Sequence, residues 1–369
     1  MKIAVLKERA PHESRVAVSP DTVKKLIDKG AEICIELGAG KGASIPDAAY
    51  KGAGATICKT AETTLNGAGV VLAVQGPETA LLDCMNKDTV LIAMLNPLTD
   101  KEYLKELAKR NITSFAMELM PRISRAQSMD VLSSQSNLAG YRAVIDAVAS
   151  FTKATPMMMT AAGTVAPAKV LVLGAGVAGL QAIATAKRLG AVVSAFDVRP
   201  AVKEQVQSLG AKFVEVPAEE SGEAAGGYAK EMSEEYKQKQ SQLISDTLAK
   251  TDIAITTALI PGKPAPILIT EEMLSRMKSG SIVVDLAVTA GGNCPFSEAD
   301  KEVVKHGVKI LSYTNVPSRV AVDASQLYAK NLLNFIAPFI AEGALAFDWE
   351  DELVAGTLVT KDGKVTLKS

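Results

Sequence analysis

The chain has 369 residues, 48% hydrophobic and 22% charged, which is enough for two globular domains. Its 40 basic and 41 acidic side chains give a formal net charge of −1, which argues against nucleic acid or an anionic membrane surface as the main partner. We expect no direct membrane insertion, because the nearest approach to a spanning segment, residues 332–347, contains Asn334, Pro338 and Glu342.

The first 120 residues alternate apolar strands with helical segments. We predict strands at residues 3–6, 32–36, 70–74, 90–95 and 113–117. We predict helices at residues 20–28, 47–51, 78–85 and 100–110. The first helix follows Ser19 as its cap, with Pro20 at its first position. Because Lys7 and Glu8 follow the first apolar stretch, we expect no signal peptide. The alternation indicates a mainly parallel sheet covered on both faces.

A long helix is predicted over residues 131–150. Four apolar side chains fall at positions that share one helix face: Leu138, Tyr141, Ile145 and Val148. A connector containing proline and glycine follows at residues 155–167. Its three consecutive methionines, residues 157–159, are typical of core filling rather than of a ligand site.

A second β/α series begins near residue 169. We predict strands at residues 169–173, 192–196 and 212–216, with helices at 179–189 and 202–209. The polar, glycine-bearing segment 217–240 is too long for an ordinary connection. It is either a lid over a site or an irregular surface loop with a helix in its second half.

The remaining chain supplies strands at residues 253–256, 282–285 and 309–311, a helix at 323–339, and a hairpin at 353–367. The hairpin is expected to turn at Asp362-Gly363. The two long helices flank the second series, which suggests an inserted domain. We therefore predict an α/β protein of two Rossmann-like parallel-sheet domains joined by two long helices, with the ligand site in the cleft. The first domain would comprise residues 1–125 plus 325–369, and the second residues 126–324.

A dinucleotide-binding fingerprint lies in the second domain. The strand at 169–173 leads into G-x-G-x-x-G at Gly174, Gly176 and Gly179, followed by a helix. These glycines suit a tight turn, backbone approach to a pyrophosphate and close helix packing. Asp197 ends the next strand, about 20 residues further on, where a carboxylate would bind the ribose hydroxyls of NAD(H). It would also repel the 2′-phosphate of NADP, although the nearby Arg199 could accommodate that phosphate.

Segments 3–8, 13–20, 259–266 and 284–288 resemble the alanine dehydrogenase family. That family uses a substrate-binding lysine, a catalytic histidine and a further aspartate. The matching positions here hold Gln75, Asn96 and Thr289, while Arg15 is retained. A proton-transferring dehydrogenase needs such groups, and the chain offers only His12 and His306 elsewhere. The four cysteines form no C-x-x-C pair, so we expect free thiols and no metal site.

Four further segments, 120–143, 226–233, 255–266 and 314–320, resemble the NAD(H)-binding component of proton-translocating nicotinamide nucleotide transhydrogenase. The resemblance covers essentially the whole chain and implies the form in which this component is a separate polypeptide. Direct transfer of hydride between two nicotinamide rings needs no acid or base at the reacting centre. The resemblance therefore accounts for an intact nucleotide fingerprint without proton-handling groups.

The resemblance also implies residue roles. The nicotinamide end of NAD(H) would be bound by a loop whose catalytic members are Arg122, Gln127, Asp130 and Ser133. Ser128 and Met129 would line its pocket. By composition alone, this stretch is equally typical of a polar linker with a helix cap at Asp130. Further cofactor contacts would come from a closing loop and from residues flanking the adenosine and pyrophosphate: Gly227, Tyr228, Met232 and Gln240; Val177, Val198, Arg199 and Leu259.

The resemblance implies a homodimer that docks with an NADP(H)-binding component and a membrane-spanning, proton-channel component. The chain would then be cytoplasmic and peripheral on the inner membrane through these partners. Two alternatives remain open from the sequence: an alanine-dehydrogenase-like enzyme acting alone, and a non-catalytic NAD-sensing or binding module.

Overall fold

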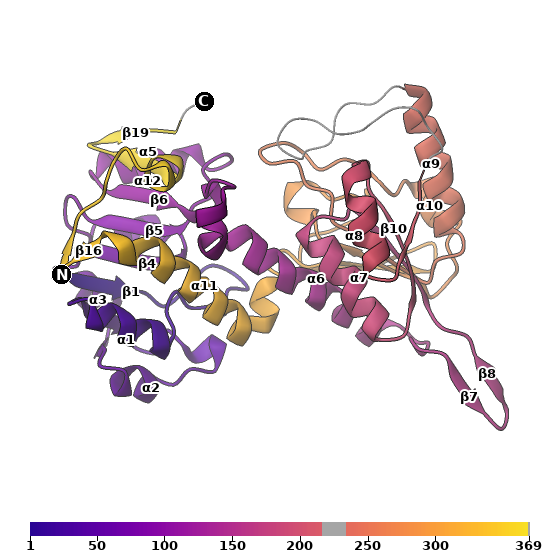
Figure 1. Ribbon diagram of the computed structural model, residues 1–369, viewed down its shortest axis with the longest axis horizontal. Helices are drawn as coiled ribbons and strands as arrows, with labels where there is room; N and C mark the ends of the chain where they lie inside the picture. The colour runs from indigo at the N-terminus through magenta and orange to yellow at the C-terminus, as the bar shows by residue number, and fades with distance from the viewer. Residues whose placement is uncertain (216–233, 368–369) are drawn as a thin grey trace. The chain divides into compact units, whose positions relative to one another are not determined.

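The computed structural model describes residues 1–215 and 234–367. These residues form two compact units: unit 1 is Met1–Gln135 with Pro317–Ser369, and unit 2 is Ser136–Val316. Each unit has its own sheet and its own helices (Figure 1). Helix α6 (Val131–Ser150) begins in unit 1 and continues into unit 2. None of the helices described in these ranges has the length and apolar character that crossing a bilayer requires.

The sheet of unit 1 is mainly parallel. Its strands are β1 (Lys2–Val5), β2 (Glu32–Glu36), β3 (Thr56–Cys58), β4 (Val70–Gln75), β5 (Val90–Met94), β6 (Thr113–Ala116), β18 (Leu358–Lys361) and β19 (Lys364–Val365). They lie in the order β19-β18-β6-β5-β4-β1-β2-β3, and only the pairings of β18 with β6 and β19 are antiparallel. From β3 to β6 this is the doubly wound order 3-2-1-4-5-6.

Helices cover both faces of the unit 1 sheet. The helices of this unit are α1 (Pro20–Asp28), α2 (Asp47–Gly52), α3 (Ala61–Leu65), α4 (Thr79–Leu82), α5 (Lys101–Lys109), α11 (Ala321–Ile336) and α12 (Glu352–Thr357). Its short 3₁₀ segments are η1 (Lys41–Ala43), η2 (Met117–Leu119), η3 (Ser124–Met129), η6 (Pro317–Val320) and η7 (Ala337–Phe339), and β16 (Ile340–Ala341) pairs with β17 (Ala344–Leu345). Side chains alternate along β1: Ile3 and Val5 pack with α1 and α11, whereas Ala4 packs with α3 and α5.

Unit 2 repeats the doubly wound order. Its sheet consists of β9 (Lys169–Leu173), β10 (Val192–Phe196), β11 (Lys212–Phe213), β12 (Ile253–Thr256), β13 (Ile282–Asp285), β14 (Lys301–Lys305) and β15 (Val308–Ser312). Its helices are α7 (Val177–Arg188), α8 (Lys203–Ser208), α9 (Glu234–Leu248) and α10 (Glu271–Ser275), with 3₁₀ segments η4 (Pro200–Val202) and η5 (Val288–Ala290). The order β11-β10-β9-β12-β13-β15-β14 reverses direction between β9 and β12, and in such sheets ligands bind at the carboxyl ends of the strands there. The prediction of two Rossmann-like parallel-sheet units is confirmed.

The predicted apolar face of α6 was wrong. Tyr141 is 40% exposed, and the side chains that pack in the core of unit 2 are Ala143, Val144 and Ala147. The physical reason is close helix packing at Gly140, where a Cβ would lie 2.0 Å from the carbonyl oxygen of Ala178 at the start of α7. Small residues therefore define the buried face, and the larger ones point elsewhere.

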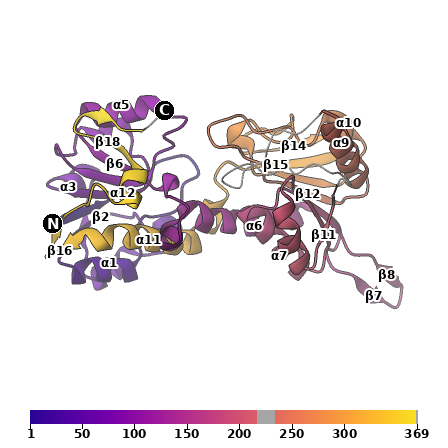
Figure 2. The same ribbon diagram turned by 45° about the horizontal axis from the view of Figure 1, so that its top comes forward.

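The interpretation of the methionine triplet was also wrong. Residues 158–165 form a hairpin of β7 (Met158–Thr160) and β8 (Gly163–Val165), which extends away from the rest of unit 2 (Figures 1 and 2). Met159 is 79% exposed because the hairpin has no second layer to cover it. In the tail, the turn at Asp362-Gly363 is confirmed, but α12 occupies the first part of the predicted hairpin.

Candidate functional site

The glycine-rich turn joins β9 to α7 at the carboxyl edge of the unit 2 sheet. Gly174 has φ +101°, a conformation that side chains other than glycine rarely adopt. Gly176 is the N-cap of α7, and a Cβ there would have only Arg199 Nη2 nearby, at 4.0 Å. A Cβ on Gly179 would lie 1.9 Å from the carbonyl oxygen of Gly174. Gly174 and Gly179 are therefore required by the turn itself, whereas Gly176 leaves open space beside it.

The first turn of α7 can accept an anion. The helix has no side-chain cap at Gly176 and no acidic residue in its first turn, so its backbone N–H groups and the positive end of its dipole face that open space. Val177, the first residue of the helix, is 41% exposed. These features fit a pyrophosphate, which binds such helix termini through backbone donors.

Asp197 adjoins this turn at the end of β10. Its Oδ2 accepts a hydrogen bond from the backbone N–H of Ala175 at 2.7 Å, and its Oδ1 accepts one from the backbone N–H of Arg199 at 2.9 Å. The Arg199 guanidinium also pairs with the carboxylate, with Nη2 2.8 Å from Oδ2. Burial opposes ionisation, but these hydrogen bonds hold the pKa of Asp197 below its usual value. A charged carboxylate therefore stands next to the turn, and Arg199 is engaged with it.

The loop after β12 closes the other side of the turn. The Thr257 hydroxyl donates to the carbonyl oxygen of Gly174 at 3.1 Å. Asn293, which is fully buried, accepts from the Ala258 backbone N–H at 3.1 Å and donates to the carbonyl oxygens of Ala258 and Pro266. These bonds fix the start of the loop. Leu259 follows and is 49% exposed, and Val198 packs partly against the core beside β10.

The predicted nicotinamide-binding segment, residues 122–133, belongs to unit 1. Two contacts attach it: Arg125 makes a two-pronged ion pair with Asp351, with both N···O distances 2.8 Å, and Asn331 of α11 donates to the carbonyl oxygen of Ser128 at 2.8 Å. Ala126 packs in the core of unit 1. The segment is thus held by side chains from the C-terminal part of the chain.

The members of this segment differ in exposure. Three predicted site residues are exposed: Arg122, Gln127 and Ser128. The Met129 side chain, by contrast, packs in the core of unit 1. Asp130 accepts a hydrogen bond from the Ser133 backbone N–H at 3.0 Å and another from its hydroxyl, so it caps α6. The cap explains the local conformation and leaves the proposed cofactor roles of these two residues to experiment.

Other predicted cofactor residues are not placed. Gly227, Tyr228 and Met232 lie outside the described residues, and Gln240 lies in α9 at a partly buried position. Within residues 1–215 and 234–367, no group of three or more acidic, histidine or cysteine side chains is arranged to hold a metal ion. The four cysteines are free thiols, and burial raises the pKa of Cys294 to about 11.

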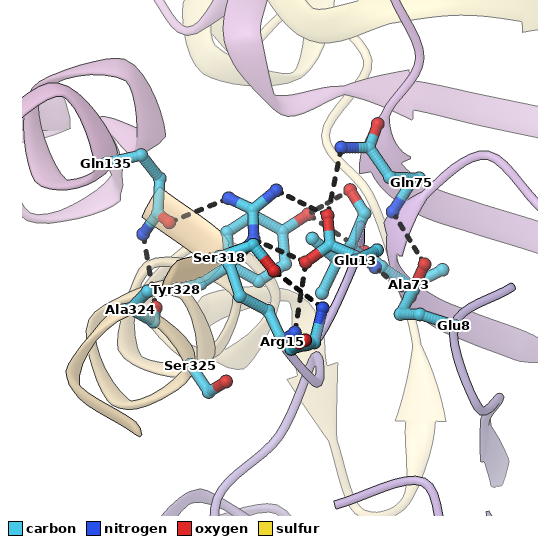
Figure 3. Close-up of polar contacts among 12 residues, drawn as sticks. Glu8, Glu13, Arg15, Ala73, Gln75, Gln135, Ser318, Ala324, Ser325 and Tyr328 are labelled. Atoms are coloured by element: carbon cyan, nitrogen blue, oxygen red, sulfur yellow. Dashed lines mark hydrogen bonds and ion pairs between the residues drawn. The ribbon is translucent and has the colours of Figure 1, made fainter. Parts of the chain in front are cut away.

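The retained Arg15 lies in a buried polar cluster (Figure 3). Its guanidinium donates to Glu13 through Nε at 2.7 Å and Nη2 at 2.6 Å, and to Gln135 Oε1 through Nη1 at 2.8 Å. The side chains of Arg15 and Glu13 are only 3% and 0% exposed. Gln75, at the position of the alanine dehydrogenase lysine, donates to Glu13 Oε2 at 3.3 Å. Arg15 and its neighbours therefore satisfy one another instead of presenting a cationic pair to a small carboxylate substrate.

Two more acids seal the carboxyl edge of this sheet. Glu8 accepts from the backbone N–H groups of Val74 and Gln75 at 2.6 and 3.2 Å, and burial raises its pKa from 4.5 to about 7. Glu118 accepts from the N–H of Asn96, the position of the alanine dehydrogenase histidine, at 2.5 Å. Burial likewise raises the pKa of Glu118. These carboxylates cap strand ends, and Asn96 supplies no proton-transfer group.

Sequence reasoning did not find the residues that support the two candidate regions. Asn331, Glu13 and Thr257 were not singled out, although each is polar and lies in or beside an apolar stretch. For Asn331 that pattern was a usable signal, because a buried amide within a core-facing helix needs partners. The partner itself, Ser128, is 203 residues away in sequence and could not be read from it.

Comparison with known proteins gives one family. The model of the alanine dehydrogenase/PNT N-terminal domain matches residues 4–139, and that of the C-terminal domain matches residues 143–368. The first part of NAD(P) transhydrogenase subunit alpha from Rhodospirillum rubrum, a separate polypeptide, is 62% identical over 374 residues, covering 99% of this chain and 97% of the relative. A crystal structure of transhydrogenase from Sinorhizobium meliloti is 52% identical with a TM-score of 0.91, covering 99% of this chain and 100% of that one. An L-alanine dehydrogenase structure is 26% identical with a TM-score of 0.80, covering 99% and 96%.

Proposed function

The chain belongs to the alanine dehydrogenase/PNT family, and from this premise we propose that it is the NAD(H)-binding component of a proton-translocating nicotinamide nucleotide transhydrogenase. One observation carries the choice within the family. The dinucleotide turn and Asp197 are complete, whereas Gln75 and Asn96 occupy the positions of the alanine dehydrogenase lysine and histidine. The relatives named NAD(P) transhydrogenase support the same choice.

We propose that the turn at Gly174–Gly179 binds the pyrophosphate of NAD(H). The backbone N–H groups at the start of α7 would donate to it across the space beside Gly176, and Val177 and Leu259 would flank it. Asp197 would accept hydrogen bonds from the adenosine ribose hydroxyls and repel a 2′-phosphate. The pairing of Arg199 with Asp197 supports NAD(H) over NADP(H), because that guanidinium is already balanced by a carboxylate.

The nicotinamide end is assigned to the 122–133 segment. Arg122 and Ser133 would bind the carboxamide, and Gln127 would reach the ribose or the partner's nucleotide. Asp130 would orient Ser133, with which it shares two hydrogen bonds. When bound, NADH supplies a hydride from its ring C4 to the nicotinamide C4 of NADP⁺ on a partner component, with no proton exchanged. The residues named here therefore need only orient a ring and exclude water.

The assignment carries partners with it. The names of the relatives denote a portion of one subunit, so we propose that this chain works with an NADP(H)-binding component and a membrane-spanning component that conducts protons. It would form a homodimer and associate with the cytoplasmic face of the membrane through those partners. Proton movement would then be coupled to hydride transfer through conformation rather than through an acid or base on this chain.

A three-way assay tests the proposal. The purified chain is mixed with the NADP(H)-binding component of a transhydrogenase, and hydride exchange between NADH and an oxidised NADP analogue is followed by absorbance. Exchange that depends on both proteins is expected. Oxidation of NADH by pyruvate and ammonium without a partner would instead indicate an alanine-dehydrogenase-like enzyme. Nucleotide binding without either activity would indicate a binding module.

A further inference from the structure

We propose that Asn331 of α11 is a positioning residue for hydride transfer, acting by holding the backbone of the 124–130 segment. This inference rests on the proposed function, because it takes that segment to hold the nicotinamide end of the cofactor. Asn331 is 6% exposed and makes no contribution to the helix that a leucine could not make. Its polarity therefore has to be explained by its partners.

The amide of Asn331 is fixed on both sides. Its Nδ2 donates to the carbonyl oxygen of Ser128 at 2.8 Å, and its Oδ1 accepts from the Ser134 hydroxyl at 2.7 Å. A second donor, Asn334 Nδ2, reaches the same Ser128 carbonyl at 3.1 Å from a more exposed position one turn away. Both amides thus converge on one backbone oxygen between Gln127 and Asp130.

The segment needs this support because it has little regular structure of its own. Residues 124–129 form the 3₁₀ segment η3, which has no side-chain cap, and Asp130 has extended backbone. The anchors in the core are Ala126 and Met129, which leaves the exposed Gln127–Ser128 peptide to be oriented by hydrogen bonds. Short 3₁₀ stretches have poorer internal hydrogen-bond geometry than α-helices, so outside partners decide their position.

The support continues inward through a chain of polar side chains. Ser134 accepts from Gln135 Nε2 at 3.2 Å, and Gln135 also donates to the carbonyl oxygen of Ala324 on α11 at 3.2 Å. Gln135 Oε1 in turn accepts from the buried Arg15 guanidinium, which Figure 3 shows lying between Gln135 and Glu13. Asn331 therefore connects the proposed nicotinamide segment to the most rigid polar cluster of unit 1.

The expected consequence is a loss of rate rather than of affinity. The adenosine and pyrophosphate contacts that dominate NADH binding are proposed to lie in unit 2, at Gly174–Gly179 and Asp197. Misplacing a positioning group by about 1 Å can reduce a rate by up to about a hundredfold. Asn331→Leu removes both hydrogen bonds at nearly constant volume, so we expect hydride exchange at saturating NADH to fall about tenfold while the Kd for NADH changes less than about twofold.

The test compares Asn331→Leu with a matched control on the same helix. Ser325 is fully buried, and its Oγ accepts a hydrogen bond from the Val16 backbone N–H at 3.0 Å, away from the segment. Ser325→Ala should lower the melting temperature to a similar degree without changing the exchange rate. Asn334→Ala removes the longer bond without opening the core, and we expect a smaller rate loss from it. Amide hydrogen exchange over residues 124–130, measured without nucleotide, should accelerate in both asparagine variants and not in Ser325→Ala.

The outcomes separate cleanly. An unchanged exchange rate in Asn331→Leu, or equal losses of rate and NADH affinity, would overturn the positioning role. Unaltered amide exchange in the segment would overturn the structural basis of that role. If the wild-type chain itself passes no hydride to its partner, the proposed function fails. In that case the amide exchange comparison still decides whether Asn331 holds the segment.

Discussion

The turn between β9 and α7 allows two glycines, three positions apart, to be separated by experiment. A methyl group on Gly179 would lie 1.9 Å from the carbonyl oxygen of Gly174. Since carbon and oxygen ordinarily approach to about 3.3 Å, α7 would have to move away from the turn by about 1.4 Å. A methyl group on Gly176 would meet nothing closer than Arg199 Nη2 at 4.0 Å, and the φ of −76° there suits alanine.

The magnitudes follow from that difference. Overpacking of this kind costs about 1–3 kcal/mol, which corresponds to a fall of about 2–12 °C in Tm for a unit of this size. Gly176→Ala should instead stay within about 0.5 kcal/mol of the wild-type stability, since it strains nothing in the free protein. It should nevertheless weaken NADH binding at least about tenfold, because its methyl group would occupy the space through which the backbone approaches the pyrophosphate.

Scanning calorimetry gives the two Tm values, and NADH fluorescence titration gives the two Kd values. The expected pattern is destabilisation with Gly179→Ala, and weakened binding at wild-type stability with Gly176→Ala. The proposed cofactor position is refuted if Gly176→Ala binds NADH as tightly as the wild type. Wild-type melting of Gly179→Ala would contradict the packing argument itself.

Three further predictions concern charged groups. Asp197→Ala should weaken NADH binding and reduce the preference for NADH over NADPH, measured by titrating both nucleotides; unchanged affinity and selectivity would exclude the ribose contact. Because burial raises the pKa of Glu8 from 4.5 to about 7, the folded chain binds more protons than the unfolded chain between those values, and stability should fall as pH rises from about 5 to about 7. Glu8→Gln should flatten that slope in urea unfolding at the two pH values, and an identical slope in the variant would show that another group is responsible. Arg15→Met leaves the fully buried Glu13 without its ion-pair partner and should cost about 3–5 kcal/mol in urea unfolding, whereas a loss below about 1 kcal/mol would mean that water replaces the guanidinium.

Local features were predictable because short-range forces decide them. The capped start of α1 at Ser19 and the Asp362-Gly363 turn each depend on residues within a few positions, and both appear as expected. The dinucleotide turn is of the same kind: Gly174 through Gly179 lie in one β-turn-α segment, and Asp197 ends the adjacent strand. Recognition of the family also required only the sequence, since the matching segments are contiguous.

Side-chain partners and burial faces were decided by tertiary structure. Periodicity assigned Tyr141 to the buried face of α6, but the close approach of Ala178 to Gly140 selected the small residues instead. The methionines at 157–159 resemble core residues in composition and are exposed because their hairpin extends from unit 2.

The sequence by itself determined two doubly wound units, the glycine turn and the absence of a lysine and a histidine from the positions where an alanine dehydrogenase has them. Only the folded chain decided that Arg15 is neutralised by Glu13 and that Asn331 holds Ser128. The physical reason is range: backbone conformation responds to neighbours a few residues away, whereas a buried polar group takes whichever partner the folded chain brings beside it.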